Sequence, residues 1–530
     1  MDTCPQKYCP PPSRSLPSPA NLQPLPSITD LLTTLQSKSW FSETTIAIKA
    51  SISGTPVFEY AHRAGGKDVG NLYDTQIRIA SVTKVFTVLA VLLSRPSIGW
   101  EDSIVKFVPG LDEEVYAEVT IKSLAEQTSG LGRFGYVGDL ALVPGFSPSQ
   151  LGLPSVTDGL PSGDVYPGGK ICSRDEVIDM FNNTAYIPTS PNSGPMYSNI
   201  AYNLLGMALE HVHSKSYQQI IQELILDPIG MLNSSFETPT DKSTAILPPA
   251  GERWFAHPFG NFDPCGGIWS TPNDMLLFLE AIQTHKLLSP AQTRKWLQPS
   301  SLLPSLHQLV GAPWEIFRPT DVDLAVPRPI DLYTKAGGVA GYSSYAVLVP
   351  EHNIALTIHV AGNDSTAATQ TLLPMIAKPL IAYADDQARK QASTKYAGTY
   401  RSMDGNNSIS ISVDDGPGLH IETAVLNGVA IIPALAAAQG LDPLKASARS
   451  YPSNSDILNR QKEEWSILLD RINEGTARGF AEQYCASWNW ADKLRYAGQS
   501  LDKIVFHVSE NKATGIEMVG WRTMLPKSDG

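Results

Sequence analysis

Hydrophobic and polar residues follow strand-like spacing in three parts of the chain. Residues 44–50 and 56–62 are rich in β-branched and aromatic side chains and flank a Ser-Gly pair, which predicts a β-hairpin. Residues 331–360 contain similar segments around three glycines and predict paired strands. After about residue 395, alternating segments separated by turn residues indicate a β domain; they are 396–400, 408–413, 419–423 and 503–523.

Helical spacing of apolar residues covers much of the chain before residue 395. The segments with this pattern are 27–39, 78–94, 173–183, 198–213, 215–226, 272–286 and 366–392. The longest apolar run, Val85 to Leu93, is interrupted only by Thr87, and it is far shorter than the roughly 20 residues that a membrane span needs. The pattern therefore predicts a chain of mixed helices and strands without a membrane span.

These patterns divide the 530 residues into three parts, as the length of the chain also suggests. Residues 1–26 contain eight prolines and little periodicity, and they predict an irregular arm. Residues 27–392 form the main unit, and within it residues 133–170 are rich in Gly, Pro and Ser and predict a long insertion that shapes or covers a site. Residues 395–530 form the β-rich C-terminal domain.

Composition and charge narrow the function classes. Hydrophobic residues make up 42% and charged residues 17% of the chain, which is typical of a folded globular protein. The net charge is −12 and no basic run stands out, so neither a nucleic acid nor an anionic membrane is expected as a partner. The N-terminus has no charged start followed by an apolar stretch, which predicts a cytoplasmic protein. Secretion is the alternative, and it would fit four N-x-[ST] sequons, at Asn182, Asn233, Asn363 and Asn406.

The cysteines indicate neither a disulfide framework nor a zinc site, because they are odd in number and widely spaced: Cys4, Cys9, Cys172, Cys265 and Cys485. Reduced, buried thiols are the favoured interpretation. In an exported protein a Cys4–Cys9 or a Cys172–Cys265 bridge would be an alternative.

Ser81-Val82-Thr83-Lys84 is an S-x-x-K motif at the start of an apolar helix. Positions i and i+3 share one helix face, so the Lys84 amine is expected beside the Ser81 hydroxyl. A serine hydroxyl is a poor nucleophile at neutral pH and requires a neighbouring base. The motif alone is weak, because Ser500-Leu501-Asp502-Lys503 repeats it. A helix-capping serine with an exposed lysine is the structural alternative.

Two further motifs carry chemistry that complements a serine nucleophile. In Tyr197-Ser198-Asn199, a tyrosine near a cationic lysine can act as general acid or base, and the Asn199 amide can orient the lysine or an acyl amide. In Lys335-Ala336-Gly337-Gly338, glycines on a strand let the backbone approach a substrate closely, and a strand-edge N–H could join the Ser81 N–H in an oxyanion hole. A capped helix start and a hairpin turn are the respective structural alternatives.

The order S-x-x-K, Y-x-N, K-x-G resembles the penicillin-binding-protein and serine β-lactamase-like superfamily, in its branch of class C β-lactamases, esterases and lovastatin-type acyltransferases. Other stretches share the resemblance: Thr75 to Ala80 before the serine, Gln127-Thr128-Ser129-Gly130-Leu131, Asp227 to Met231, and Gly266-Gly267 with Ser270-Thr271 and Asp274-Met275. The resemblance covers about residues 27–390. The last domain resembles the lipocalin-like C-terminal module of some fungal members.

The resemblance implies an α+β fold, in which helices flank an antiparallel sheet beside an all-α region that holds Tyr197. It implies that Ser81 is the acylated nucleophile and that Lys84 and Tyr197 share the proton transfer. Asn199 would orient the substrate or the lysine, and Lys335 would tune the electrostatics of Tyr197. The N–H groups of Ser81 and Gly338 would bind the oxyanion, beside Gly337. No metal and no cofactor are expected.

Departures from the family pattern shape the expected substrate. Ala336 stands where β-lactamases carry Thr or Ser, whose hydroxyl helps bind the carboxylate of a β-lactam, and the insertion lengthens the spacing from Ser81 to Tyr197. Glu126 or Gln127 replaces a family histidine. We therefore expect ester, thioester or transesterification chemistry on a bulky acyl group, free or on a carrier protein, as in fungal polyketide pathways. The alternatives are a β-lactamase or D-Ala-D-Ala peptidase-like amidase and a catalytically inactive binding protein.

Other hydrolase classes do not fit the sequence. There is no G-x-S-x-G elbow of the α/β-hydrolases and no H-E-x-x-H zinc motif.

Overall fold

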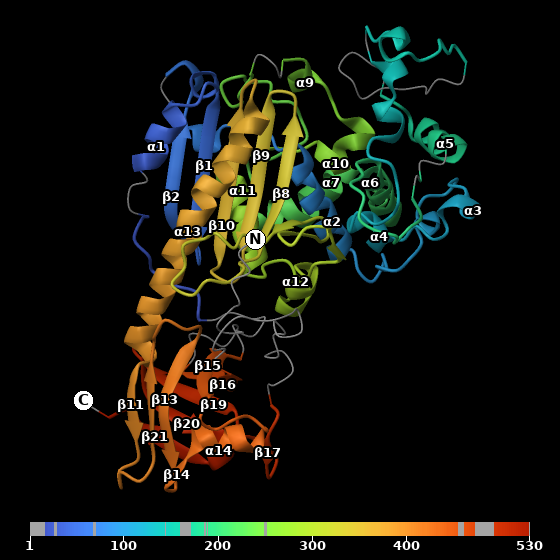
Figure 1. Ribbon diagram of the computed structural model, residues 1–530. Helices are drawn as coiled ribbons and strands as arrows, with labels where there is room; N and C mark the ends of the chain where they lie inside the picture. The colour runs from blue at the N-terminus through green and yellow to red at the C-terminus, as the bar shows by residue number, and fades with distance from the viewer. Residues whose placement is uncertain are drawn as a thin grey trace.

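The computed structural model describes residues 16–25, 29–66, 70–143, 145–158, 171–184, 187, 189–248, 252–453, 461–471 and 492–528. The expectations for most of the N-terminal arm, for Cys4, Cys9 and Cys485, and for the second part of the insertion lie outside these residues. The described part of the arm, residues 16–25, runs along the long helix α13 (Ser365–Tyr396). There, the hydroxyl of Tyr383 donates to the carbonyl oxygen of Gln23. Figure 1 shows the two domains that this helix joins.

The main domain is built on an eight-stranded sheet in the order β2-β1-β10-β9-β8-β7-β6-β5, in which every neighbouring pair is antiparallel. Its strands are β1 (Thr45–Ile52), β2 (Thr55–His62), β5 (Ser301–Leu302), β6 (Gln308–Val310), β7 (Glu315–Phe317), β8 (Leu332–Val339), β9 (Tyr342–Val349) and β10 (Ile354–Ala361). The predicted hairpin is confirmed as β1 and β2, and the predicted paired strands as β8, β9 and β10. The N-terminal hairpin joins the sheet through β10, far along the chain.

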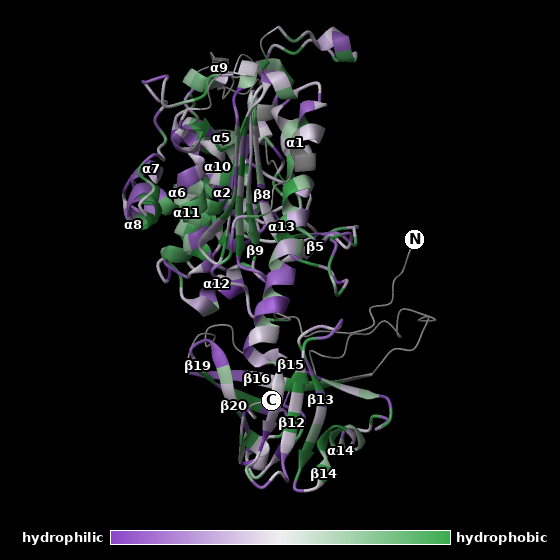
Figure 2. Cartoon of the chain, turned by 90° about the vertical axis from the view of Figure 1, so that its left-hand side faces the viewer, coloured by the Kyte–Doolittle hydropathy of each residue, from purple (hydrophilic) through white to green (hydrophobic). Residues whose placement is uncertain are grey.

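Helices cover both faces of this sheet, as Figure 2 shows with the sheet nearly edge-on. One face packs against α1 (Thr29–Gln36) and α13 (Ser365–Tyr396) through Leu356, Ile358 and Val360 of β10. The other face packs against α2 (Thr83–Leu93) and α11 (Pro272–Gln283). Strands β9 and β10 are buried along their whole length, which explains their nearly continuous apolar sequence.

The all-α region lies beyond α2 and shares its core. Its helices are α3 (Glu113–Tyr116), α4 (Ile121–Ala125), α5 (Arg174–Thr184), α6 (Ile200–His213), α7 (Tyr217–Ile221), α8 (Asp227–Ile229), α10 (Asp263–Gly266) and α12 (Pro290–Trp296). The short helix α9 (Glu252–Ala256) packs elsewhere, with Phe255 in a small cluster beside Trp269 and Tyr342. The helix predicted over 215–226 is α7 followed by a π-helical turn at Gln222–Leu226. The described part of the insertion, residues 133–143 and 145–158, contains short 3₁₀ turns as its helical elements and projects from the body near α5 (Figure 1).

The C-terminal domain is a nearly closed barrel of eight antiparallel strands. They are β11 (Gly398–Arg401), β12 (Ser408–Ser412), β13 (Leu419–Leu426), β15 (Ala446–Pro452), β16 (Lys462–Arg471), β19 (Lys503–Ser509), β20 (Lys512–Met518) and β21 (Thr523–Pro526). The first and last strands meet, because Tyr400 bridges Lys527 and the Ser528 N–H donates to the Thr399 carbonyl oxygen at 2.9 Å. The short strand β14 (Val429–Ala430) and the helix α14 (Ile431–Ala438) follow β13. The predicted β domain is confirmed.

Helix α13 belongs to both domains. Its first turns, including Leu372 and Ile376, lie in the core of the sheet, whereas Ala388, Ala392 and Tyr396 lie in the core of the barrel. At its end, Lys395 Nζ and the Tyr396 hydroxyl donate to the fully buried Glu463 of β16, at 2.7 and 2.6 Å. Within the described residues, no helix has the length and apolarity to cross a membrane.

Candidate active site

Ser81 lies in a 3₁₀ turn, Ala80–Val82, which leads directly into α2. Ala80 has a φ of 46°, a left-handed conformation that costs free energy for a residue with a side chain. The turn is held from the sheet, because the Ser344 hydroxyl of β9 donates to the Ile79 carbonyl oxygen at 2.9 Å. On β8, a Cβ added to Gly337 would lie 2.0 Å from the same oxygen, so a glycine is needed for the strand to approach the turn.

Lys84 is fully buried one helical turn after the serine. Its ammonium donates to Ser81 Oγ at 3.0 Å, to Asn199 Oδ1 at 2.8 Å and to the Cys265 carbonyl oxygen at 2.8 Å. These three acceptors match the three N–H groups of an ammonium. The Cys265 thiol forms no disulfide, so the alternative Cys172–Cys265 bridge is absent.

Tyr197 lies at the centre of a group of cations. The Nζ atoms of Lys84 and Lys335 are 5.3 and 5.1 Å from the centre of its ring, and the guanidinium carbon of Arg133 is 4.9 Å away. Burial raises the pKa of the phenol, but Lys335, Lys84 and a hydrogen bond with Ser81 together outweigh it, so the pKa of Tyr197 is below its usual range. The three separate motifs therefore meet around the side chain of Tyr197.

Lys335 is fixed beside this phenol by a carboxylate that belongs to none of the three sequence motifs. Glu315 of β7 accepts from Lys335 Nζ at 2.5 Å and from the backbone N–H of Ala336 at 3.2 Å. Burial lowers the pKa of Lys335, but Glu315 and Tyr197 more than compensate, so its pKa is raised. Lys335 therefore remains a cation next to Tyr197.

The backbone N–H of Gly338 lies on the edge of β8 that faces away from β9. The Ala336 N–H points away from β9, toward Glu315, and backbone N–H groups two residues apart on a strand point to the same side. The Gly338 N–H therefore lies on that edge, beyond the point where β7 ends its pairing at Thr334. Among the described residues, no atom other than those of Gly338 and its chain neighbours lies within 4 Å of the position that a Cβ of Gly338 would occupy.

A second unexpected contributor is Gln127, which holds the backbone on both sides of Tyr197. The Ser198 N–H donates to Gln127 Oε1 at 2.5 Å, and the Met196 N–H donates to the Gln127 carbonyl oxygen at 2.7 Å. Gln127 is buried and has a φ of 63°, so its backbone is itself strained. The only signal in the sequence was its place at a family histidine position.

The segment after Gln127 forms further hydrogen bonds with the Y-x-N motif. The Ser198 hydroxyl donates to the Gly132 carbonyl oxygen at 2.9 Å, and the Asn199 N–H donates to the Arg133 carbonyl oxygen at 2.8 Å. Residues 127–133 therefore fix the Y-x-N motif before its helix, α6, begins. The insertion leaves the protein body at Arg133, directly beside Tyr197.

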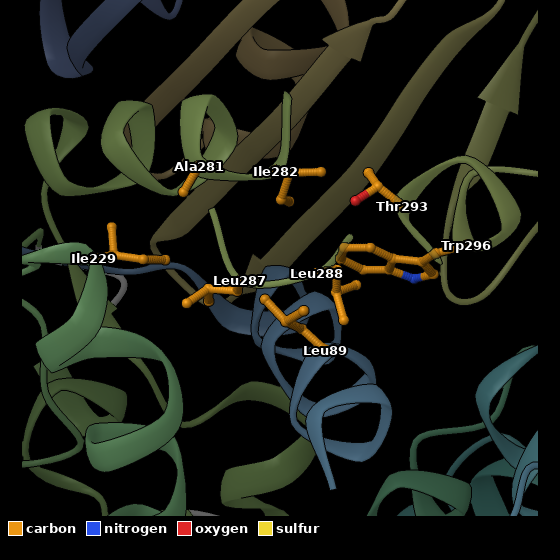
Figure 3. A pocket seen from close by; sticks show the side chains of 8 residues that line it. All are labelled: Leu89, Ile229, Ala281, Ile282, Leu287, Leu288, Thr293 and Trp296. Carbon is orange, nitrogen blue, oxygen red and sulfur yellow. The ribbon is translucent and has the colours of Figure 1, made fainter. Parts of the chain in front are cut away.

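The pocket in Figure 3 is a different feature from this site. It is small and apolar, and it lies toward the other end of α2, where Leu89 contributes to its wall. Its lining residues are Leu89, Ile229, Ala281, Ile282, Leu287, Leu288, Thr293 and Trp296, none of which is a predicted site residue. Within the described ranges, no group of three His, Cys, Asp or Glu residues is arranged to bind a metal ion.

Family models match nearly the whole described chain. Residues 44–378 match the family described as Beta-lactamase, and residues 388–529 match the family described as Beta-lactamase-like-like, C-terminal domain. The short stretch between the two matches lies inside α13. This arrangement agrees with a helix whose ends lie in two different cores.

Two fungal proteins are similar over most of the chain. The "Beta-lactamase-like protein" of Arthroderma benhamiae is 28% identical over 505 residues, which cover 87% of this chain and 83% of that protein. The "Probable hydrolase M10" of Phoma sp. is 26% identical over 527 residues, which cover 92% and 85% of the two chains.

More distant similarity extends to bacterial proteins. The D-alanyl-D-alanine-carboxypeptidase/endopeptidase AmpH of Escherichia coli is 25% identical over 327 residues, covering 58% of this chain and 76% of that protein. The crystal structure of a D-amino acid amidase from Ochrobactrum anthropi has a TM-score of 0.50 at 18% identity, covering 68% of this chain and 99% of the other. The latter similarity concerns the fold alone.

Proposed function

The chain belongs to the β-lactamase family, and on that basis we propose that it is a serine hydrolase or acyltransferase that works through an acyl-enzyme on Ser81. One observation carries the proposal: Lys84 Nζ lies 3.0 Å from Ser81 Oγ, while Tyr197, hydrogen-bonded to the same serine, has a lowered pKa. A nucleophile with a base within hydrogen-bonding distance is what acyl transfer to serine requires. An inactive binding protein would have no need to keep these three groups together.

We assign the role of base to the Tyr197 phenolate. The N–H groups of Lys84 already have three acceptors, whereas the phenolate is stabilised by two neighbouring ammonium groups. Tyr197 takes the proton of Ser81 as Oγ attacks the carbonyl carbon of the substrate. The resulting oxyanion is bound by the N–H groups of Ser81 and Gly338. Tyr197 then returns the proton to the leaving alcohol or thiol as the carbon–oxygen or carbon–sulfur bond breaks.

The second half of the reaction repeats these steps with a new nucleophile. A water molecule, an alcohol or an amine loses a proton to Tyr197 and attacks the acyl carbon. The bond to Ser81 Oγ breaks, and Oγ recovers the proton. The same residues therefore serve hydrolysis and acyl transfer, and the acceptor decides between the two.

The substrate class proposed is an ester or thioester of a bulky, largely apolar acyl group of the polyketide type. Ala336 offers no side-chain hydroxyl at the position where β-lactamases bind the carboxylate of a β-lactam. The insertion that begins beside Tyr197 exposes several large apolar side chains, namely Phe134, Leu140, Leu151, Leu153 and Val156. Of these, Phe134 lies against Arg133, 5.4 Å from its guanidinium carbon, and an exposed apolar side chain at this position fits an apolar ligand. The similarity to a bacterial carboxypeptidase keeps an amidase as the second candidate.

Trapping the acyl-enzyme tests the proposal. The protein is incubated with a panel of acyl thioesters, with a fluorophosphonate and with the β-lactam nitrocefin, and its intact mass is measured. We expect the fluorophosphonate to form a stable adduct on Ser81 and the bulky thioesters to form acyl adducts. Nitrocefin should be turned over little. The Ser500→Ala variant removes the serine of the other S-x-x-K motif and is the matched control; it should label like the wild type, whereas Ser81→Ala should not label. An unmodified wild-type mass with every reagent would refute an enzymatic role, and efficient nitrocefin hydrolysis would favour the amidase.

A further inference from the structure

Arg133 is an exposed cation at the edge of the proposed active site. Its carbonyl oxygen accepts the Asn199 N–H at 2.8 Å, so its backbone is fixed to the Y-x-N motif. Its guanidinium carbon lies 4.9 Å from the centre of the Tyr197 ring and 5.4 Å from that of Phe134. Two aromatic faces thus hold the side chain beside the reacting groups.

The charges around Tyr197 leave this cation without a compensating anion. Lys84, Lys335 and Arg133 surround the ring, and the carboxylate of Glu315 is already paired with Lys335. Among the described residues no carboxylate forms an ion pair with Arg133, whereas five other arginines have one: Arg174, Arg318, Arg328, Arg449 and Arg495. Even with an ionised Tyr197, the group of five side chains has an excess positive charge.

A guanidinium that lies over an aromatic ring can still donate the N–H groups at its edge to an anion. This edge presents a planar fork that matches the two oxygens of a carboxylate. Ala336, on the strand side of the site, has no hydroxyl to bind such a group. The exposed anion-binding group therefore comes from the start of the insertion, on the Tyr197 side.

We propose that Arg133 is a substrate-recognition residue that binds a carboxylate carried by the acyl substrate. This inference rests on the proposed function and narrows it: the substrate is an ester or thioester that is amphipathic, with an apolar body for the exposed side chains of the insertion and a carboxylate for Arg133. The carboxylate can belong to the acyl part or to the leaving group, and the two require different probes.

The experiment compares matched esters. The mono-p-nitrophenyl ester of glutaric acid has a carboxylate on the acyl part, and its methyl ester is the uncharged counterpart; 4-butyryloxybenzoic acid has the carboxylate on the leaving group, and its methyl ester is again the counterpart. We expect the wild type to prefer one charged ester over its counterpart, as a ratio of kcat/KM. In Arg133→Gln this ratio should fall about tenfold, mainly through KM, because a charge-assisted hydrogen bond is lost. Arg133→Lys keeps the positive charge but loses the planar guanidinium, so it should retain part of the preference for the charged ester.

The ratio separates recognition from catalysis, because both esters of a pair depend on the same Tyr197. The exposed Arg401 of the barrel is the matched control, and Arg401→Gln should leave the ratio unchanged. A wild type that shows no preference for either charged ester, or a preference that survives in Arg133→Gln, would overturn the role of Arg133 while leaving the acyl-enzyme proposal intact. If no ester of the panel acylates Ser81, the proposed function itself fails, and this inference fails with it.

Discussion

Gln127 accepts hydrogen bonds from the backbone N–H groups on both sides of Tyr197, one with its side chain and one with its carbonyl oxygen. The position of the phenol is therefore set by a residue that need not touch the substrate. A tyrosine at the start of a helix would otherwise have considerable freedom, and the proton transfer proposed for Tyr197 depends on its distance from Ser81.

The Gln127→Met variant tests this positioning role. Methionine fills a similar volume but accepts no comparable hydrogen bond, so the Ser198 N–H loses its partner. We expect kcat for a neutral ester to fall about tenfold with a smaller change in KM, since one buried hydrogen bond is worth about 1–2 kcal/mol. Steady-state kinetics measures the split, and circular dichroism confirms folding. A folded variant with unchanged kcat would contradict the assignment.

The pH dependence of kcat/KM reports the ionisation of Tyr197. The phenolate form is the active base, so activity should rise with pH through the pKa of Tyr197 and then level off, below the pH expected for an ordinary tyrosine. In Lys335→Met a positive charge that lowers this pKa is lost, and the rising limb should move to higher pH.

Lys335→Arg retains the positive charge, so the rising limb of its pH profile should lie near that of the wild type. The exposed Lys390 of α13 provides a distant control, because Lys390→Met should not alter the profile. A rising limb at the same pH in Lys335→Met and in the wild type would exclude Tyr197 as the titrating base.

Gly337 and Gly338 are adjacent but should respond differently to an added methyl group. In Gly337→Ala the new Cβ would meet the Ile79 carbonyl oxygen at 2.0 Å, and the strand must move away from the turn that holds Ser81. We expect a loss of about 2 kcal/mol in the free energy of unfolding, as is common for overpacking. In Gly338→Ala the methyl group enters open space, and the urea midpoint should hardly change. Equal midpoints for the two variants would show that the contact does not constrain the strand.

The buried carboxylate of Glu463 should stabilise the junction of α13 with the barrel. Glu463→Ala leaves Lys395 and the Tyr396 hydroxyl without their shared acceptor, and breaking a buried pair in this way costs about 3 kcal/mol or more. Its neighbour Glu464 forms a surface pair with Lys503, so Glu464→Ala should cost less than about 1 kcal/mol. Thermal unfolding of the full chain compares the two, and a similar loss for both would mean that burial does not strengthen the Glu463 contact.

Much of the fold could be predicted because its signals are local. The S-x-x-K spacing places Lys84 beside Ser81 through helix geometry alone, and β-branched alternation identifies the strands that form the centre of the sheet. The barrel was expected from its first and last strands. Strands β15 and β16 were not predicted individually, and neither was α14, an apolar helix within an otherwise β-rich domain.

The residues that contact and position the predicted site residues could not be predicted from local signals. Glu315, Gln127 and Arg133 contact the predicted residues only because distant segments of the chain meet, and each looks ordinary in its own neighbourhood. For Gln127 the only trace was a departure from the family pattern. Hydrogen bonds to backbone groups leave little signature in a single sequence, since the atoms that accept them are present at every residue.

Because α13 is one continuous helix with its first turns in the sheet and its last turns in the barrel, it contains no point where the protein can be cut cleanly. A catalytic fragment that ends with the helix would expose Ala388, Ala392 and Tyr396 to solvent, and one that ends earlier would remove the first wall of the barrel. Truncated forms made for crystallisation or assays would therefore expose apolar residues that promote aggregation. The two domains are best expressed and engineered as a single chain.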